Sequence, residues 1–143
     1  MSEESQASVR FLEHTADIGI EVTGPSLESV IGEAAMAMTR LMLGDAVPLG
    51  EDERTFEIVG DEPALLLRNV LRELLFLYSA EGFALGGLDL ELEGGEPGLK
   101  ARCRAHGGTP GDPPKTELKG VTLHGLRAER EEGGWRARVI FDV

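Results

Sequence analysis

The chain has 143 residues, a length that fits one domain and is sufficient to bury a hydrophobic core. Hydrophobic residues make up 41 % of it and charged residues 28 %, as in ordinary soluble globular proteins. No segment approaches the roughly 18 apolar residues that a membrane span needs, and no basic-then-apolar leader is visible. Its single cysteine, Cys103, excludes an internal disulfide and a zinc site built on cysteines. We therefore expect a cytoplasmic protein without a membrane partner.

The charge is strongly acidic and unevenly distributed. Fourteen basic residues stand against 26 acidic ones, which gives a formal net charge of −12. Residues 1–99 carry 5 basic and 20 acidic side chains, whereas residues 100–143 carry 9 and 6. Binding to nucleic acid by counterion release needs a basic surface, so we expect no direct binding to nucleic acid. An acidic surface suits a basic partner or a hard cation, and it also simply keeps a protein soluble.

The first third of the chain predicts two strands followed by a helix. Residues 1–8 are polar and are expected to be flexible, which leaves residues 9–143 as a single domain. A strand–turn–strand pattern covers residues 10–22, and its second strand alternates between core and solvent. The inward positions of that strand are Ile18, Ile20 and Val22. Ser26 is a candidate N-cap, and Gly44 a candidate stop, for a helix with one apolar face.

The remainder predicts one more helix among several strands. A strand at 55–59 precedes a helix that starts at Asp61 and ends at Gly82. Later segments have period-two patterns, with a loop at 107–114 that is rich in glycine and proline. The predicted strands lie near 88–93, 99–105, 117–129 and 135–142. This order indicates the α+β class, with two amphipathic helices packed on a largely antiparallel or mixed β-sheet.

Three oxygen-bearing groups are candidates for a metal site. Asp17 begins a strand and points away from the core, while Asp142 and the Val143 carboxylate end the chain. Such oxygen ligands suit a hard cation such as calcium or magnesium. On local evidence, a strand-end aspartate capping a turn is the commoner role for Asp17, and Asp142 could equally be part of a solvated terminus. The site would draw on both only if the terminal strand pairs with the strand that holds Asp17.

Other chemically capable residues are isolated in the sequence. His14 and His124 could bind a ligand or transfer protons, but lone histidines in strands are more often structural. Lys119 lies in a predicted strand, where a lysine is usually just exposed, and Cys103 has no neighbour that would activate its thiol. Phosphate-binding, dinucleotide and nucleophile-elbow motifs are absent, and aromatic residues make up only 5 %. The residues alone therefore favour a binding or accessory role over catalysis.

Two separated segments resemble the archease family. The first is Phe-Leu-Glu-His-Thr-Ala-Asp-Ile-Gly-Ile at 11–20. The second comprises Glu-Leu-Lys-Gly-Val-Thr-Leu-His-Gly-Leu at 117–126 and Gly-Trp-Arg-Ala-Arg-Val-Ile-Phe-Asp-Val at 134–143. The chain differs from the family pattern at Gly120, where alanine is more usual, and at Leu123, where tyrosine is. The order and spacing of the segments match the family over nearly the whole chain.

The resemblance implies an accessory protein rather than an enzyme. Archeases assist RtcB-type ligases, which join a 3′-phosphate or 2′,3′-cyclic phosphate RNA end to a 5′-hydroxyl end in tRNA splicing and RNA repair. They promote guanylylation of the ligase and its multiple turnover. By the same resemblance, Asp17, Asp142 and Val143 would bind a divalent cation, with calcium favoured and magnesium or manganese compatible. Lys119 matches a lysine implicated in activity, and His14 and His124 remain activity-supporting candidates.

Two other functions remain open from the sequence. A chaperone-like module that binds RNA-processing or RNA-modifying enzymes would have an equally acidic surface. A small metal-dependent hydrolase would use Asp17 and Asp142 together with His14 or His124. Stoichiometry separates an activator from a chaperone, because an activator works at sub-stoichiometric amounts. Phosphatase or esterase turnover by the protein alone would identify the hydrolase.

Overall fold

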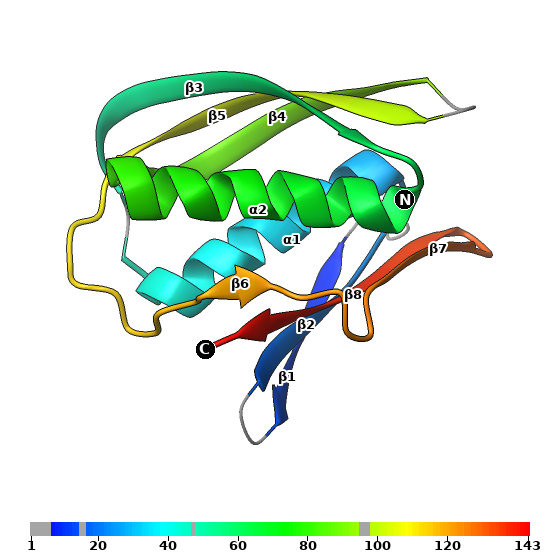
Figure 1. The fold of residues 1–143 in the computed structure, drawn as a ribbon, viewed down its shortest axis with the longest axis horizontal. Helices are drawn as coiled ribbons and strands as arrows, with labels where there is room; N and C mark the ends of the chain where they lie inside the picture. The colour runs from blue at the N-terminus through cyan, green and yellow to red at the C-terminus, as the bar shows by residue number, and fades with distance from the viewer. Residues whose placement is uncertain (1–6, 15–16, 47, 95–97) are drawn as a thin grey trace.

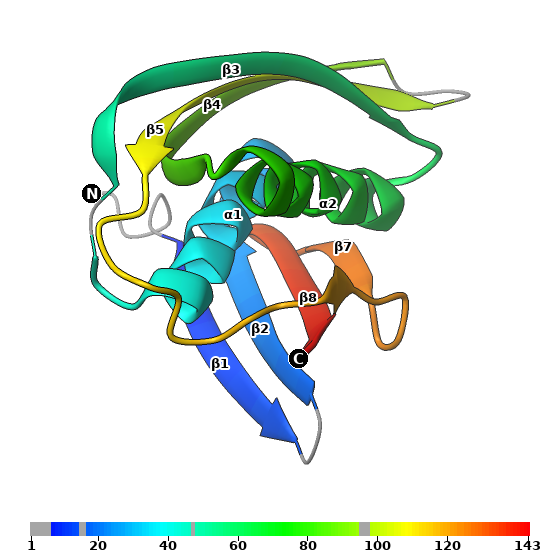
Figure 2. The ribbon, with the colours of Figure 1, turned by 60° about the vertical axis from the view of Figure 1, so that its left-hand side comes forward.

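Two helices lie between two antiparallel β-sheets (Figures 1 and 2). The structure is a computed structural model, and it describes residues 7–14, 17–46, 48–94 and 98–143. Its secondary structure confirms the predicted α+β class. The strands form two sheets, however, where the sequence pattern suggested one. The reason is that the helices bury apolar residues on more than one side, so each sheet covers a different side of them.

The five-stranded sheet has the order β1-β2-β8-β6, and β7 also pairs with β8. Its strands are β1 (Ser8–His14), β2 (Asp17–Gly24), β6 (Gly120–Val121), β7 (Arg127–Glu131) and β8 (Gly134–Asp142). The three-stranded sheet has the order β3-β5-β4 and arches over the helices (Figure 1). Its strands are β3 (Leu49–Gly60), β4 (Ala84–Gly94) and β5 (Leu99–Thr109). β1 thus begins at the last residue of the segment predicted to be flexible, and residues 1–6 lie outside the described part.

The helix boundaries follow the predicted capping residues closely. α1 (Leu27–Leu43) has Ser26 as its N-cap, and the side chains of Ser26 and Ser29 each accept a hydrogen bond from the other's backbone N–H. Gly44 closes α1 at a φ of 67°. α2 (Pro63–Glu81) begins two residues later than predicted. Pro63 lies in its first turn, where the missing N–H of proline is not needed, and Gly82 ends the helix in the left-handed conformation.

The core is formed where the helices meet both sheets. The predicted inward residues Ile20 and Val22 are 0 % and 1 % exposed, and Ile18 is half-buried. From the other end of the chain, Val139 and Phe141 are fully buried. α1 buries more than the single face its periodicity indicates, because it contacts β2 and β8 on one side and β4 on the other.

The structure corrects two predicted segments. Strand β5 continues through Gly107 and Gly108, which were assigned to a loop. These glycines are required there, since a Cβ at Gly107 would lie 1.9 Å from the Ala84 carbonyl oxygen. The strand predicted over 117–129 is instead two strands, β6 and β7, joined by residues 122–126. No helix in the described part of the chain is long and apolar enough to cross a membrane.

Candidate functional site

The pairing of β2 with β8 brings the two predicted acidic residues together. Asp17 is the direct cross-strand partner of Asp142 in the antiparallel register. Both occupy positions that alternate with the buried residues, so both side chains belong to the outward face of the five-stranded sheet. Direct partners in such a pair have Cβ atoms roughly 5 Å apart. Two carboxylates more than 120 residues apart in sequence therefore become neighbours at one end of the sheet.

The segment around Lys119 completes this end of the sheet. The Lys119 backbone N–H donates to the Asp142 carbonyl at 2.8 Å, and Gly120 is the cross-strand partner of Asp142. This hydrogen bond occupies one of the two lone pairs of the Asp142 carbonyl oxygen. A Cβ at Gly120 would lie 3.7 Å from the Asp142 Oδ2 atom, so alanine would also fit there. The Lys119 side chain is exposed.

The two candidate histidines occupy different surroundings. His14 is the last residue of β1 and pairs in register with Asp17. His124 lies in the exposed segment between β6 and β7, and its backbone N–H donates to the Thr122 hydroxyl at 3.2 Å. Register thus places His14 beside the acidic pair, whereas Gly125, next to His124, lies against Arg138 and Ile140 instead.

We call Asp17, Asp142 and the C-terminal Val143 the acidic tip. Asp17 is half-buried, Asp142 is exposed and Val143 is 41 % exposed, so the tip is open to solvent. Nowhere in the described residues do three or more His, Cys, Asp or Glu side chains converge as a metal site. A cation at the tip would therefore need the terminal carboxylate, water or a partner to supply ligands beyond Asp17 and Asp142. Oxygen donors of this kind match calcium, magnesium or manganese.

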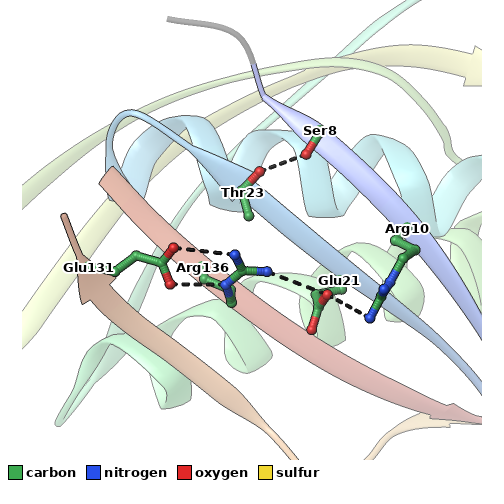
Figure 3. Close-up of polar contacts among 6 residues, drawn as sticks. All are labelled: Ser8, Arg10, Glu21, Thr23, Glu131 and Arg136. Carbon is green, nitrogen blue, oxygen red and sulfur yellow. Dashed lines mark hydrogen bonds and ion pairs between the residues drawn. The ribbon is translucent and has the colours of Figure 1, made fainter. Parts of the chain in front are cut away.

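Beyond the tip, the same sheet face carries a row of ion pairs (Figure 3). Glu21 forms an ion pair with Arg10 at 3.0 Å and accepts a hydrogen bond from Arg136 at 3.5 Å, and Arg136 also donates to Glu131 at 2.9 Å. Those carboxylates raise the pKa of Arg136, with the Glu131 hydrogen bond as the main cause. Nothing in the sequence predicted this row, although its members all fall on outward positions of their strands.

Cys103 has the ordinary structural role that the sequence predicts. It lies in the centre of β5, is 4 % exposed, and burial raises its pKa to about 11. A cavity of about 900 Å³ lies nearby between the start of α1 and the three-stranded sheet. Glu28 lines it from the helix, and Phe56 and Leu90 from the sheet. None of its lining residues belongs to the acidic tip, so this cavity does not overlap the tip.

Comparison with known proteins now identifies the family. Residues 10–143 match the model of the Archease protein family, and this range includes the whole acidic tip. The chain belongs to the archease family. The resemblance seen in the two sequence segments is thereby confirmed over almost the entire chain.

Curated archeases cover the chain nearly end to end. Protein archease of Archaeoglobus fulgidus is 36 % identical over 136 residues, which are 94 % of this chain and 98 % of that protein. Protein archease of Pyrococcus abyssi is 33 % identical over 136 residues, covering 92 % and 95 %. The similarity is therefore to whole archeases rather than to one part of them.

Solved structures show the same fold. The solution structure of protein 1598 of Methanobacterium thermoautotrophicum superimposes with a TM-score of 0.81 at 31 % identity, covering 94 % of this chain and 98 % of that one. The crystal structure of an archease from Thermotoga maritima gives 0.59 at 25 % identity, covering 92 % and 94 %. The Thermotoga protein is described as a possible chaperone. The archease fold thus accounts for both sheets and both helices of this chain.

Proposed function

We propose that this archease activates an RtcB-type RNA ligase, which joins 3′-phosphate and 5′-hydroxyl ends in tRNA splicing and RNA repair. Membership of the archease family supports this choice of partner. The observation that carries the proposal is the direct opposition of Asp17 and Asp142 at the open end of the sheet, beside the chain terminus. The proposed role is that of a protein cofactor in the cytoplasm, not of an enzyme.

The proposed mechanism uses the acidic tip as a carrier of a divalent cation, calcium foremost. Asp17, Asp142 and the Val143 carboxylate would hold the cation, and a cation bound there would supply positive charge to neutralise phosphates during nucleotidyl transfer. Strand pairing holds the two aspartates in place, and the hydrogen bond from the Lys119 backbone N–H to Asp142 fixes the end of β8. The exposed tip can reach into a partner's active site, and the exposed Lys119 side chain can approach an anionic group there.

Ligation with a limiting amount of ligase tests this function. The assay contains an RtcB-type ligase from the same source, GTP, a divalent metal, and this protein at about a tenth of the ligase concentration. An activator should raise product well beyond one join per ligase molecule and increase the guanylylated fraction of ligase. Asp17→Ala and Asp142→Ala should remove the stimulation, whereas Asp52→Ala, at an exposed position of β3, should keep it. Full stimulation by both tip variants would disprove the role of the tip.

A chaperone-like module is the second candidate function. The description of the Thermotoga archease favours it, as do several large apolar side chains that are 48–63 % exposed. They are Phe11, Leu49, Val59, Phe76 and Leu123. Such residues could contact a client enzyme. A chaperone of this kind would need roughly one molecule per client and would suppress aggregation without the acidic tip, so retention of that activity in Asp17→Ala separates it from ligase activation.

A further inference from the structure

Two arginines face each other on the outward side of the five-stranded sheet, and neither forms an ion pair with another described residue. Arg127 of β7 is the direct cross-strand partner of Arg138 of β8. Like charges directly opposite each other on neighbouring strands are destabilising. Both side chains are exposed, and within the described residues no carboxylate lies within 4 Å of either guanidinium. We call these two residues the arginine pair.

The carboxylates nearest in register do not relieve this repulsion. Glu21 is the partner of Arg138 across β2, but its Oε1 atom is engaged by Arg10 and Arg136. Glu129 lies opposite Arg136 rather than opposite either member of the pair. The Arg138 side chain lies toward the 122–126 segment, where its Nε is 3.7 Å from the position of a Cβ on Gly125. Neither arginine therefore belongs to the ion-paired row in Figure 3, although Glu21 of that row is the register partner of Arg138.

The arginine pair and the acidic tip share one face of one sheet. Arg138 and Asp142 both occupy outward positions of β8, four residues apart, which corresponds to roughly 13 Å along a strand. Between them, Ile140 packs against Gly19 of β2 and is 8 % exposed. A partner that contacts the tip from this side would cover the arginine pair as well.

We infer that the arginine pair is a docking contact for carboxylate side chains of the partner protein. Guanidinium groups bind carboxylates in a bidentate manner, and an incoming carboxylate would remove the repulsion between Arg127 and Arg138. The net charge of −12 disfavours both an RNA backbone and a second copy of this chain as the occupant. The inference rests on the proposed function for the identity of the partner, the RNA ligase.

The test measures binding of the ligase to charge-reversed variants. Arg127→Glu and Arg138→Glu should each weaken binding of the ligase about tenfold or more. Raised salt should reduce the difference in affinity between each variant and the wild type. Arg40→Glu makes the same change of net charge at an exposed position of α1 and should bind like the wild type. Equal binding by all three variants would overturn the inference.

Four further readouts make the failures distinguishable: melting temperature, stimulation of ligation, RNA binding and light scattering. Without ligase, Arg127→Glu should melt above the wild type, because it replaces a like-charged pair by an opposite one; a lower melting temperature would contradict the repulsion. If Arg138→Glu binds the ligase with unchanged affinity and stimulates ligation as strongly as the wild type does, the docking contact is refuted and the proposed function stands. A wild type that neither binds nor stimulates the ligase refutes both. If the wild type binds a fluorescent single-stranded RNA and Arg127→Glu and Arg138→Glu do not, RNA is the occupant instead of the partner protein. If light scattering shows a dimer of the wild type but not of these variants, a second copy of the chain is the occupant.

Discussion

Neutralising one aspartate of the acidic tip should stabilise the metal-free protein. Asp17 and Asp142 are direct cross-strand partners of like charge, and such a pair costs roughly 0.2–1 kcal/mol. Asp17→Asn keeps the size and shape of the side chain while removing that repulsion. For a chain of 143 residues, about 1 kcal/mol corresponds to roughly 3 °C in melting temperature. In the presence of a chelator, Asp17→Asn should therefore melt about 1–3 °C above the wild type.

Calcium should reverse this order. A cation that binds only the folded state, at a concentration 100 times its Kd, stabilises that state by about 2.7 kcal/mol, or roughly 8 °C here. The wild type should show this increase between chelator and saturating calcium, and Asp17→Asn should lose most of it because one of its ligand oxygens is replaced by an amide nitrogen. Differential scanning calorimetry in both conditions measures the two shifts, and isothermal titration supplies the Kd.

A matched control separates the tip from the general acidity of the protein. Asp52→Asn makes the same change at an exposed position of β3, outside the tip, and should leave the calcium shift at its wild-type value. If calcium raises the melting temperature of Asp17→Asn as much as that of the wild type, the tip is not the metal site. If Asp17→Asn melts below the wild type in chelator, the repulsion between the aspartates has been misjudged.

Three further predictions concern the fold that supports the site. Gly107→Ala should destabilise the protein by at least about 3 kcal/mol in urea unfolding, because the new Cβ would overlap the Ala84 carbonyl oxygen. Gly87→Ala on β4 is the control: no atom lies within 4 Å of a Cβ there, and stability should change by less than about 1 kcal/mol. The free energy of unfolding should fall between about pH 9 and pH 11, since the unfolded chain loses the Cys103 proton in that range while the folded chain retains it. If a Cys103→Ala variant shows the same fall, groups other than Cys103 cause it. Ser26→Ala should cost roughly 1 kcal/mol by removing the cap of α1, and an unchanged denaturation midpoint would contradict that role.

Local patterns in the sequence were sufficient for most elements. The capping of α1 by Ser26, its end at Gly44 and the inward residues of β2 and β8 follow from short-range rules of periodicity and backbone conformation. The same rules failed at 107–108, where glycine usually signals a loop. There, glycine permits close approach of neighbouring strands, and that requirement is visible only once β5 lies between β3 and β4.

The sequence by itself determined the fold class, the family resemblance and the acidic residue types at both ends of the chain. It could not determine that Asp17 and Asp142 are partners, because a register between segments more than 100 residues apart is set by how the whole sheet assembles. Nor could it indicate that Arg127 and Arg138 oppose each other, since each looks like an ordinary exposed strand residue in isolation. Tertiary structure decided both pairings, because the charge that a side chain meets depends on its cross-strand neighbour and not on its neighbours in sequence.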